Sequence, residues 1–308
     1  MSCKHLTSLH SCIARFLSRI PPEIKILVVA LLAFYQITFL QNSLKWEVLR
    51  TDLPQRYFIG EALQNGNMPL WNPYMPGGQD VLAHTPAAWS PEVILPAFIS
   101  GYTNLTLHFF FMLHVLVAGL GMFYLHRRMS GNDTAAFITG TAYMLSGVFV
   151  GHAQHMGILT GAAWMPWVLL WYLRLYQNPR FMSFLPLFMF LFLMLTGGHP
   201  SLSVLLLAVM LIPAIVGSFR HWRRHDDFRR WLFWNALLIL VVAAWIVLEW
   251  KVLQAGAGLA AGAVNGATVN PLAGQWSSMA FLAFIFPFGV AGNAGFWGTS
   301  LGMANSFI

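Results

Sequence analysis

Long apolar runs constrain this chain more than any other feature of its sequence. Stretches of apolar residues recur along the chain, and short polar links separate them. A helix of about 20 apolar residues crosses a hydrocarbon core of about 30 Å. Apolar residue types make up 57% of the sequence and charged types only 9%, whereas soluble domains carry about 25% charged residues. We therefore predict an all-α fold, a polytopic transmembrane helical bundle of about eight spans with a long first extracytoplasmic loop.

The order of polar and apolar segments predicts five parts. They are a basic cytoplasmic tail that could form an interfacial helix (1–22), a first transmembrane helix (23–44), an extracytoplasmic loop (45–104), a transmembrane bundle with short links (105–250), and a Gly- and Ala-rich outer loop with a candidate last span (251–308). Within the bundle, spans are expected near residues 105–125, 134–150, 157–173, 181–196, 201–218 and 231–250. The first apolar run has no small-residue cleavage site after it, so we interpret it as a retained anchor.

The distribution of basic residues predicts the orientation. With the N-terminus in the cytoplasm, 13 of the 17 Lys and Arg residues fall in cytoplasmic segments, as the positive-inside rule expects. The outer segments hold only Lys45, Arg50, Arg56 and Lys251. This topology explains the net charge of +7 better than a nucleic-acid partner does. It also places the 51–84 loop and the links that carry His152 and His199 on one face, outside the cytoplasm.

Asp52 is the first candidate for chemistry, because it follows the first span closely and lies near the outer interface. A carboxylate there can act as general base on a hydroxyl group, or can ligate a divalent cation. Arg56 lies one helical turn further and could hold a phosphate. The alternative interpretation is an interfacial ion pair that caps a juxtamembrane helix.

The run from Met68 to Tyr74, followed by Gly77 and Gly78, predicts a rigid turn lined by aromatic rings. The rings of Trp71 and Tyr74 with the amide of Asn72 suit a sugar, although aromatic residues are also common at membrane interfaces.

Histidines in two outer links, His152 and His199 among them, could receive a phosphate leaving group or bind a metal. The alternative is that they are hydrogen-bonded turn residues. His108 and His114 lie within a predicted span and are expected to bond to neighbouring helices. The two cysteines, Cys3 and Cys12, form no metal-binding pattern. No Walker loop, dinucleotide fingerprint or protease motif occurs in the sequence.

Taken together, the outer motifs resemble a known family. The residues Asp52-Leu53-Pro54-Gln55-Arg56-Tyr57 precede a PLWNPY run at residues 69–74 and Gly77-Gly78-Gln79, and Gly198-His199-Pro200 follows much later. This order resembles the YfhO-like bacterial membrane proteins, which are related to GT-C glycosyltransferases. Members of that family are usually longer, so this chain is similar to a truncated member, and a second chain could complete the fold.

The resemblance implies a membrane glycosyltransferase in the bacterial cytoplasmic membrane. It would move a sugar from a polyprenyl-phosphate donor to a cell-envelope glycopolymer or glycolipid on the outer face, with Asp52 as base. Arg56, His152 and His199 match recurring polar positions of the family and are expected to bind phosphate, and Trp71, Asn72, Tyr74 and Gln79 are expected to bind the sugar or acceptor. No cofactor is required, while a divalent metal stays open. The alternatives are a lipid or solute translocator and a non-catalytic membrane partner left by truncation.

Overall fold

The computed structural model describes residues 20–45, 47–74, 78–81, 90–99, 101–199, 229–245 and 247, with parts of 202–215. All of them belong to the first of two compact units, Met1–Val252. The predicted outer loop and last span over 251–308 lie outside the described residues, as does nearly all of the predicted tail over 1–22.

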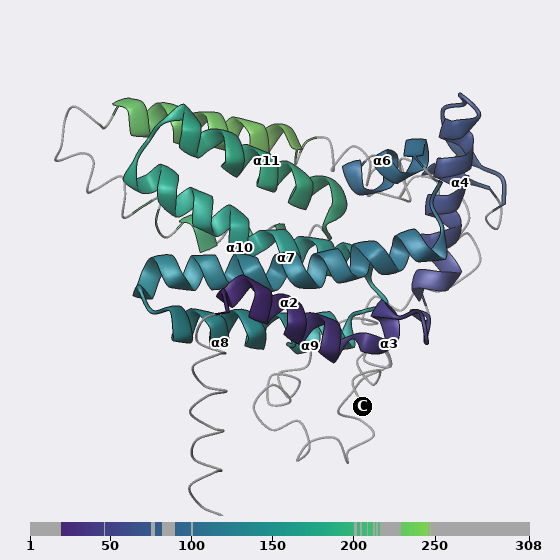
Figure 1. The fold of residues 1–308 in the computed structure, drawn as a ribbon. Helices are drawn as coiled ribbons and strands as arrows, with labels where there is room; N and C mark the ends of the chain where they lie inside the picture. The colour runs from purple at the N-terminus through teal and green to yellow at the C-terminus, as the bar shows by residue number, and fades with distance from the viewer. Residues whose placement is uncertain are drawn as a thin grey trace, which may run out of the picture. The chain divides into compact units, whose positions relative to one another are not determined.

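The described chain is almost entirely helical (Figure 1). The helices are α2 (Pro22–Ala33), α3 (Tyr35–Thr38), the π-helical turn η1 (Val48–Asp52), α4 (Leu53–Gln64), α6 (Pro91–Ile99), α7 (Asn104–Ser130), α8 (Asp133–Met144), α9 (Gly147–Gly151), α10 (Met156–Gln177) and α11 (Phe181–Gly197). Two short strands, β1 (Trp71–Asn72) and β2 (Gln79–Asp80), form an antiparallel hairpin. The described residues of 229–245 are helical as well.

Three helical segments are long and apolar enough to cross a membrane: Asn104–Ser130, Asp133–Gly151 and Met156–Gln177. They coincide with three of the predicted spans, and α11 is a shorter apolar helix of 17 residues over a fourth. The chain therefore carries the helices of a membrane protein.

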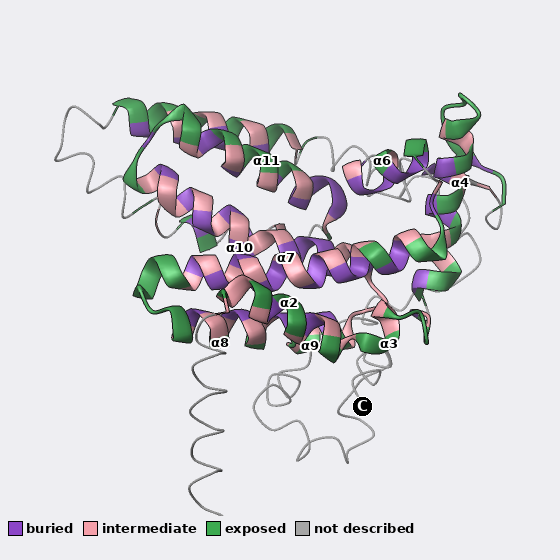
Figure 2. Cartoon of the chain, viewed as in Figure 1, coloured by how far each residue is buried: buried purple, intermediate pink, exposed green. Residues whose placement is uncertain are grey.

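The surface of α11 fits the same environment. Phe181, Met182, Leu185 and Met189 are each about half exposed or more, and exposed positions recur along the helix in Figure 2. A contiguous apolar face of this kind is rare on soluble monomers. Contact with lipid chains accounts for it.

The first predicted span differs from the expectation. It is two helices rather than one, because α2 ends at Ala33 and α3 begins at Tyr35. Phe34 separates them with φ of −109° and ψ of 31°, outside the α-helical region. A helix of 12 residues is about 18 Å long, too short to cross the hydrocarbon core alone.

The long helix α7 has a defined start and a defined end. Thr103 and Thr106 form a reciprocal capping box at its N-terminus, which satisfies backbone N–H groups that have no partner within the helix. Gly131 ends the helix in the left-handed conformation, with φ of 69°, where glycine carries no steric penalty.

The helices pack in sequence order around α7 and α10. α7 lies against α2, α8 and α10, and α10 lies against α11. One buried apolar cluster includes Ile26, Phe111, Phe123, Met144 and Leu159. A second cluster joins α10 and α11 to described residues of 202–215 and 229–245. The short helices α4 and α6 pack on each other, and α6 also contacts α11, so they are held beside the starts of α7 and α10.

Candidate functional site

Asp52 lies where the π-helical turn η1 meets α4. Its backbone is helical, with φ of −64° and ψ of −49°, and its side chain does not cap α4. The partly buried carboxylate instead accepts a hydrogen bond from the backbone N–H of Met156, the first residue of α10. His155 precedes that residue and makes no side-chain capping bond. Asp52 therefore caps α10, a helix far from it in sequence. The negative charge of its carboxylate is stabilised by the positive end of the α10 dipole.

The surroundings of Asp52 make it a stronger base than an exposed aspartate. Burial, together with the nearby Glu47 carboxylate, raises the pKa of the Asp52 carboxyl against the lowering effects of Arg56, the Met156 N–H and His155. A carboxylate whose pKa is raised toward neutrality removes a proton from a hydroxyl more readily than one with an ordinary pKa. The arrangement can therefore support general-base chemistry, and it can equally serve as a structural cap.

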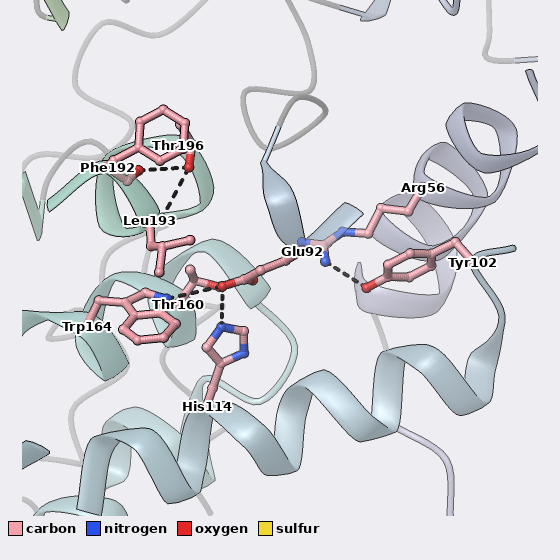
Figure 3. A network of polar contacts seen from close by, with 9 residues as sticks. All are labelled: Arg56, Glu92, Tyr102, His114, Thr160, Trp164, Phe192, Leu193 and Thr196. Atoms are coloured by element: carbon pink, nitrogen blue, oxygen red, sulfur yellow. Dashed lines mark hydrogen bonds and ion pairs between the residues drawn. The ribbon is translucent and has the colours of Figure 1, made fainter. Parts of the chain in front are cut away.

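Arg56 lies inside this end of the molecule rather than on its surface. Its side chain is 3% exposed, and Nη1 donates a hydrogen bond to the hydroxyl of Tyr102 at 2.8 Å. Its charge acts on both Asp52 and Glu92, and Figure 3 shows the guanidinium between Tyr102 and Glu92. The charge of Arg56 thus lies near two carboxylates from different elements of the fold.

Glu92, on α6, is the main residue of this region that was not predicted from the sequence. Its carboxylate is bonded to three side chains: His114 Nε2 at 3.0 Å, Trp164 Nε1 at 3.1 Å and Thr160 Oγ1 at 3.5 Å (Figure 3). Because His114 belongs to α7 and the other two belong to α10, one carboxylate ties three helices together. Although burial raises the pKa of Glu92, the ion pair with His114, the hydrogen bonds from His114 and Trp164, and the charge of Arg56 together hold this pKa below its ordinary value.

A sequence signal for this network existed. Glu92 is an acid in a short apolar segment, and His114 lies in a predicted span. Ionisable residues in such places are costly unless they pair. The expectation that the span histidines bond to neighbouring helices is confirmed for His114, which pairs with Glu92 of α6. His108 is bonded instead to a non-helical segment, since the backbone N–H of Leu44 donates to His108 Nε2 at 3.3 Å.

The histidine links meet beside Asp52. The rings of His152 and His155 are 5.7 Å apart, and His155 forms a 3.5 Å ion pair with Glu47. The backbone N–H of His199 donates to the carbonyl of Gly157 at 2.8 Å. Partial burial, followed by the nearby His155, lowers the pKa of both His152 and His199. These two imidazoles are therefore neutral at pH 7 and could donate one hydrogen bond each to a phosphate.

Glycines allow this meeting of α10 and α11. A Cβ on Gly161 would lie 2.9 Å from Leu202 and 3.6 Å from the Cα of Gly198. A Cβ on Gly198 would lie 3.0 Å from the Cα of Gly161, whereas one on Gly157 would make an ordinary contact, 3.5 Å from the backbone nitrogen of His199. The lack of side chains at Gly161 and Gly198 lets the two helix ends approach closely, and this approach brings His199 to the start of α10.

The predicted aromatic turn is the β1–β2 hairpin. Trp71 is 54% exposed and Tyr74 is 82% exposed. The Trp71 ring lies across Gly78, since a Cβ there would be 2.3 Å from it. Tyr74 meets Phe58 of α4 edge to face at 6.0 Å. The exposed rings could pack on a sugar or on lipid.

Asn72 and Gln79 are the two polar residues predicted to bind substrate. Asn72 is 4% exposed, and its Oδ1 accepts a hydrogen bond from the Tyr74 N–H at 3.0 Å, so it shapes the turn. The side chain of Gln79 lies outside the described part of the chain.

Among the described residues, no group of three or more His, Cys, Asp and Glu side chains is arranged to hold a metal ion. No family model, curated protein or solved structure matches the chain.

Proposed function

We propose that this chain is a membrane glycosyltransferase that uses a polyprenyl-phosphate sugar donor and a cell-envelope acceptor on the outer face of the bacterial cytoplasmic membrane. Asp52 is the general base. A single observation carries the proposal: the base candidate, Arg56 and the histidines of two separate links gather at one end of helices that are long enough to span a membrane.

In the proposed reaction, Asp52 takes the proton of the acceptor hydroxyl. The resulting oxygen attacks the anomeric carbon of the sugar from the side opposite the leaving group. The bond between that carbon and the phosphate oxygen breaks, and the lipid phosphate departs with the electron pair, so the anomeric configuration inverts. Asp52 is suited to this role because its raised pKa brings it closer to the pKa of a hydroxyl.

The remaining predicted residues take supporting roles in this proposal. His152 and His199 donate hydrogen bonds to the departing phosphate, and Arg56 supplies positive charge from within the protein. Trp71 and Tyr74 offer exposed rings to the sugar or acceptor, with Asn72 fixing the turn between them. A lipid-linked donor also accounts for the lack of a nucleotide-binding motif in the sequence.

The two alternatives make different demands. A translocator needs ionisable residues near the middle of its spans, whereas in the three described candidate spans the histidines His108 and His114 are bonded to neighbouring segments. A non-catalytic partner has no need of the Asp52 carboxylate beyond capping α10, so an amide at that position would serve equally well.

The deciding test is sugar transfer from a polyprenyl-phosphate donor by the full chain in vesicles, with Asp52→Asn against wild type. We expect a loss of about 100-fold or more, the usual size for a missing general base. The matched control is Glu61→Gln, which removes a carboxylate from the exposed face of the same helix and should leave the rate unchanged.

Equal thermal unfolding midpoints are needed, because Asp52 also caps α10. Transfer by Asp52→Asn at the wild-type rate would move the base elsewhere. Absence of transfer by folded wild type would instead favour the non-catalytic partner.

A further inference from the structure

A pocket far from Asp52 in the chain combines arginines with aromatic rings. It has a volume of about 490 Å³ and is lined by Pro179, Arg180, Phe181, Arg229, Arg230, Phe233 and Trp234. This volume falls within the range of small-molecule sites. Three of the seven lining residues are arginines, and none of the seven is acidic.

Phe181, Phe233 and Trp234 supply aromatic rings to this pocket, here called its aromatic floor. The Trp234 ring lies tilted against Phe181, with ring centres 6.1 Å apart, and against Phe184, with centres 4.9 Å apart. Phe184 also belongs to the buried cluster that joins α11 to the helix of residues 229–245. The floor therefore ties together the two helices that supply the arginines.

The three pocket arginines differ from other basic residues near the same helix ends. Arg127 is paired with Asp133 at 2.7 Å, and the guanidinium of Arg174 lies over the Trp171 ring at 4.1 Å. Among the described residues, no acidic side chain forms an ion pair with Arg180, Arg229 or Arg230. The pocket thus concentrates positive charge that the described part of the chain leaves uncompensated.

We propose that this pocket binds the headgroup of an anionic phospholipid. Arginine forks bind phosphate oxygens through paired hydrogen bonds, and basic pockets between membrane helices are known sites for anionic headgroups. The aromatic floor suits the glycerol and first acyl carbons of a lipid, which a free phosphate lacks. The N-terminus of α11, where Arg180 is the N-cap residue, adds a favourable dipole. This inference is independent of the proposed sugar transfer.

The test is native mass spectrometry of the full chain released from nanodiscs with equal amounts of phosphatidylglycerol and phosphatidylcholine. We expect wild type to retain phosphatidylglycerol preferentially. The variant R180Q/R229Q/R230Q should lower the ratio of bound phosphatidylglycerol to bound phosphatidylcholine by at least about tenfold, since each basic residue contributes roughly 1 kcal/mol to such binding.

The matched control is R127Q/R128Q/R174Q, which removes the same charge from the neighbouring helix ends. It should keep the wild-type ratio within about twofold if the pocket, not general surface charge, selects the lipid. An unchanged ratio in the pocket variant, or an equal loss in the control variant, would overturn the proposal. If the pocket variant does not fold, Arg180→Gln alone should lower the ratio by about threefold or more, and no change would again overturn it.

Excess inorganic phosphate separates the two sources of the phosphate group. The lipid assignment expects no displacement of bound phosphatidylglycerol, because the aromatic floor contributes to binding. Displacement by inorganic phosphate would show that the pocket selects a free phosphate, and the lipid assignment would be wrong.

Discussion

Two charged side chains near Asp52, Glu92 and Arg56, are buried, whereas the charged pair where α7 ends and α8 begins is exposed. Glu92 is 8% exposed and Arg56 is 3% exposed; Glu92 is bonded to His114 on another helix, and Arg56 is bonded to Tyr102 in the segment between α6 and α7. In the exposed pair of Arg127 and Asp133, the side chains are 46% and 55% exposed. Exposed basic residues such as Arg127 are explained by the positive-inside rule for membrane proteins. The buried network has no such general explanation, so it is the better place to look for function.

The largest expected effect at the buried end is on stability. Replacing Glu92 with Ala should lower the free energy of unfolding by about 3–5 kcal/mol, because removal of one partner leaves a buried charge or dipole uncompensated. His114, Trp164 and Thr160 would all lose their acceptor. Denaturant unfolding of the full chain in detergent measures the effect. Glu92→Gln keeps the shape and one acceptor oxygen and should cost less. If the free energy of unfolding of the alanine variant falls by less than about 1 kcal/mol, Glu92 contributes no more to stability than an exposed ion pair does.

The second effect concerns pH and the two carboxylates at the same end. Because the pKa of Asp52 is raised, the ionised base forms at a higher pH than for an ordinary aspartate. The transfer rate should rise about tenfold per pH unit below that pKa and level off above it. Initial transfer rates measured from acidic to neutral pH give this dependence.

The contributions of Glu92 and Asp52 to the free energy of unfolding depend on pH in opposite directions. The lowered pKa of Glu92 means that its contribution to stability is complete above its unfolded pKa and is lost as the pH falls through the folded value. The raised pKa of Asp52 means that its contribution is present at low pH and is lost as the pH rises through its folded pKa.

The variant Asp52→Glu tests the rate prediction. If the pH dependence of its transfer rate is the same as in wild type, a group other than Asp52 controls that dependence.

The smallest effect belongs to the exposed end. Asp133→Asn removes the ionic partner of Arg127 and should change the free energy of unfolding by less than about 1 kcal/mol, since exposed ion pairs contribute little. The same denaturant measurement in low and high salt serves here. A change as large as that for Glu92→Ala would erase the distinction between the two ends.

Much of the fold could be predicted from local sequence. The apolar runs over 105–125, 134–150 and 157–173 predicted the three helical segments that are long enough to cross a membrane. The Pro- and Gly-rich run over residues 69–78 predicted a turn, and the hairpin lies there. The first predicted span could not be resolved in this way, because its interruption at Phe34 involves neither proline nor glycine.

The site was predictable only as a set of candidates. Asp52, Arg56, His152 and His199 were selected by residue type and by their place outside the spans, and the structure brings them to one end of the bundle. Glu92 was overlooked because its neighbours in sequence are apolar. Its partners His114, Thr160 and Trp164 lie 22, 68 and 72 residues away.

The sequence by itself determined that the chain is helical, that several segments suit a membrane and which residue types could do chemistry. These properties depend on apolar length and on charge, which each segment carries locally. Only the tertiary structure decided that Asp52 caps α10, that Arg56 turns inward to Tyr102 and that Glu92 joins three helices. A buried polar group must find a partner, but many partners are available along the chain, and helix packing selects among them.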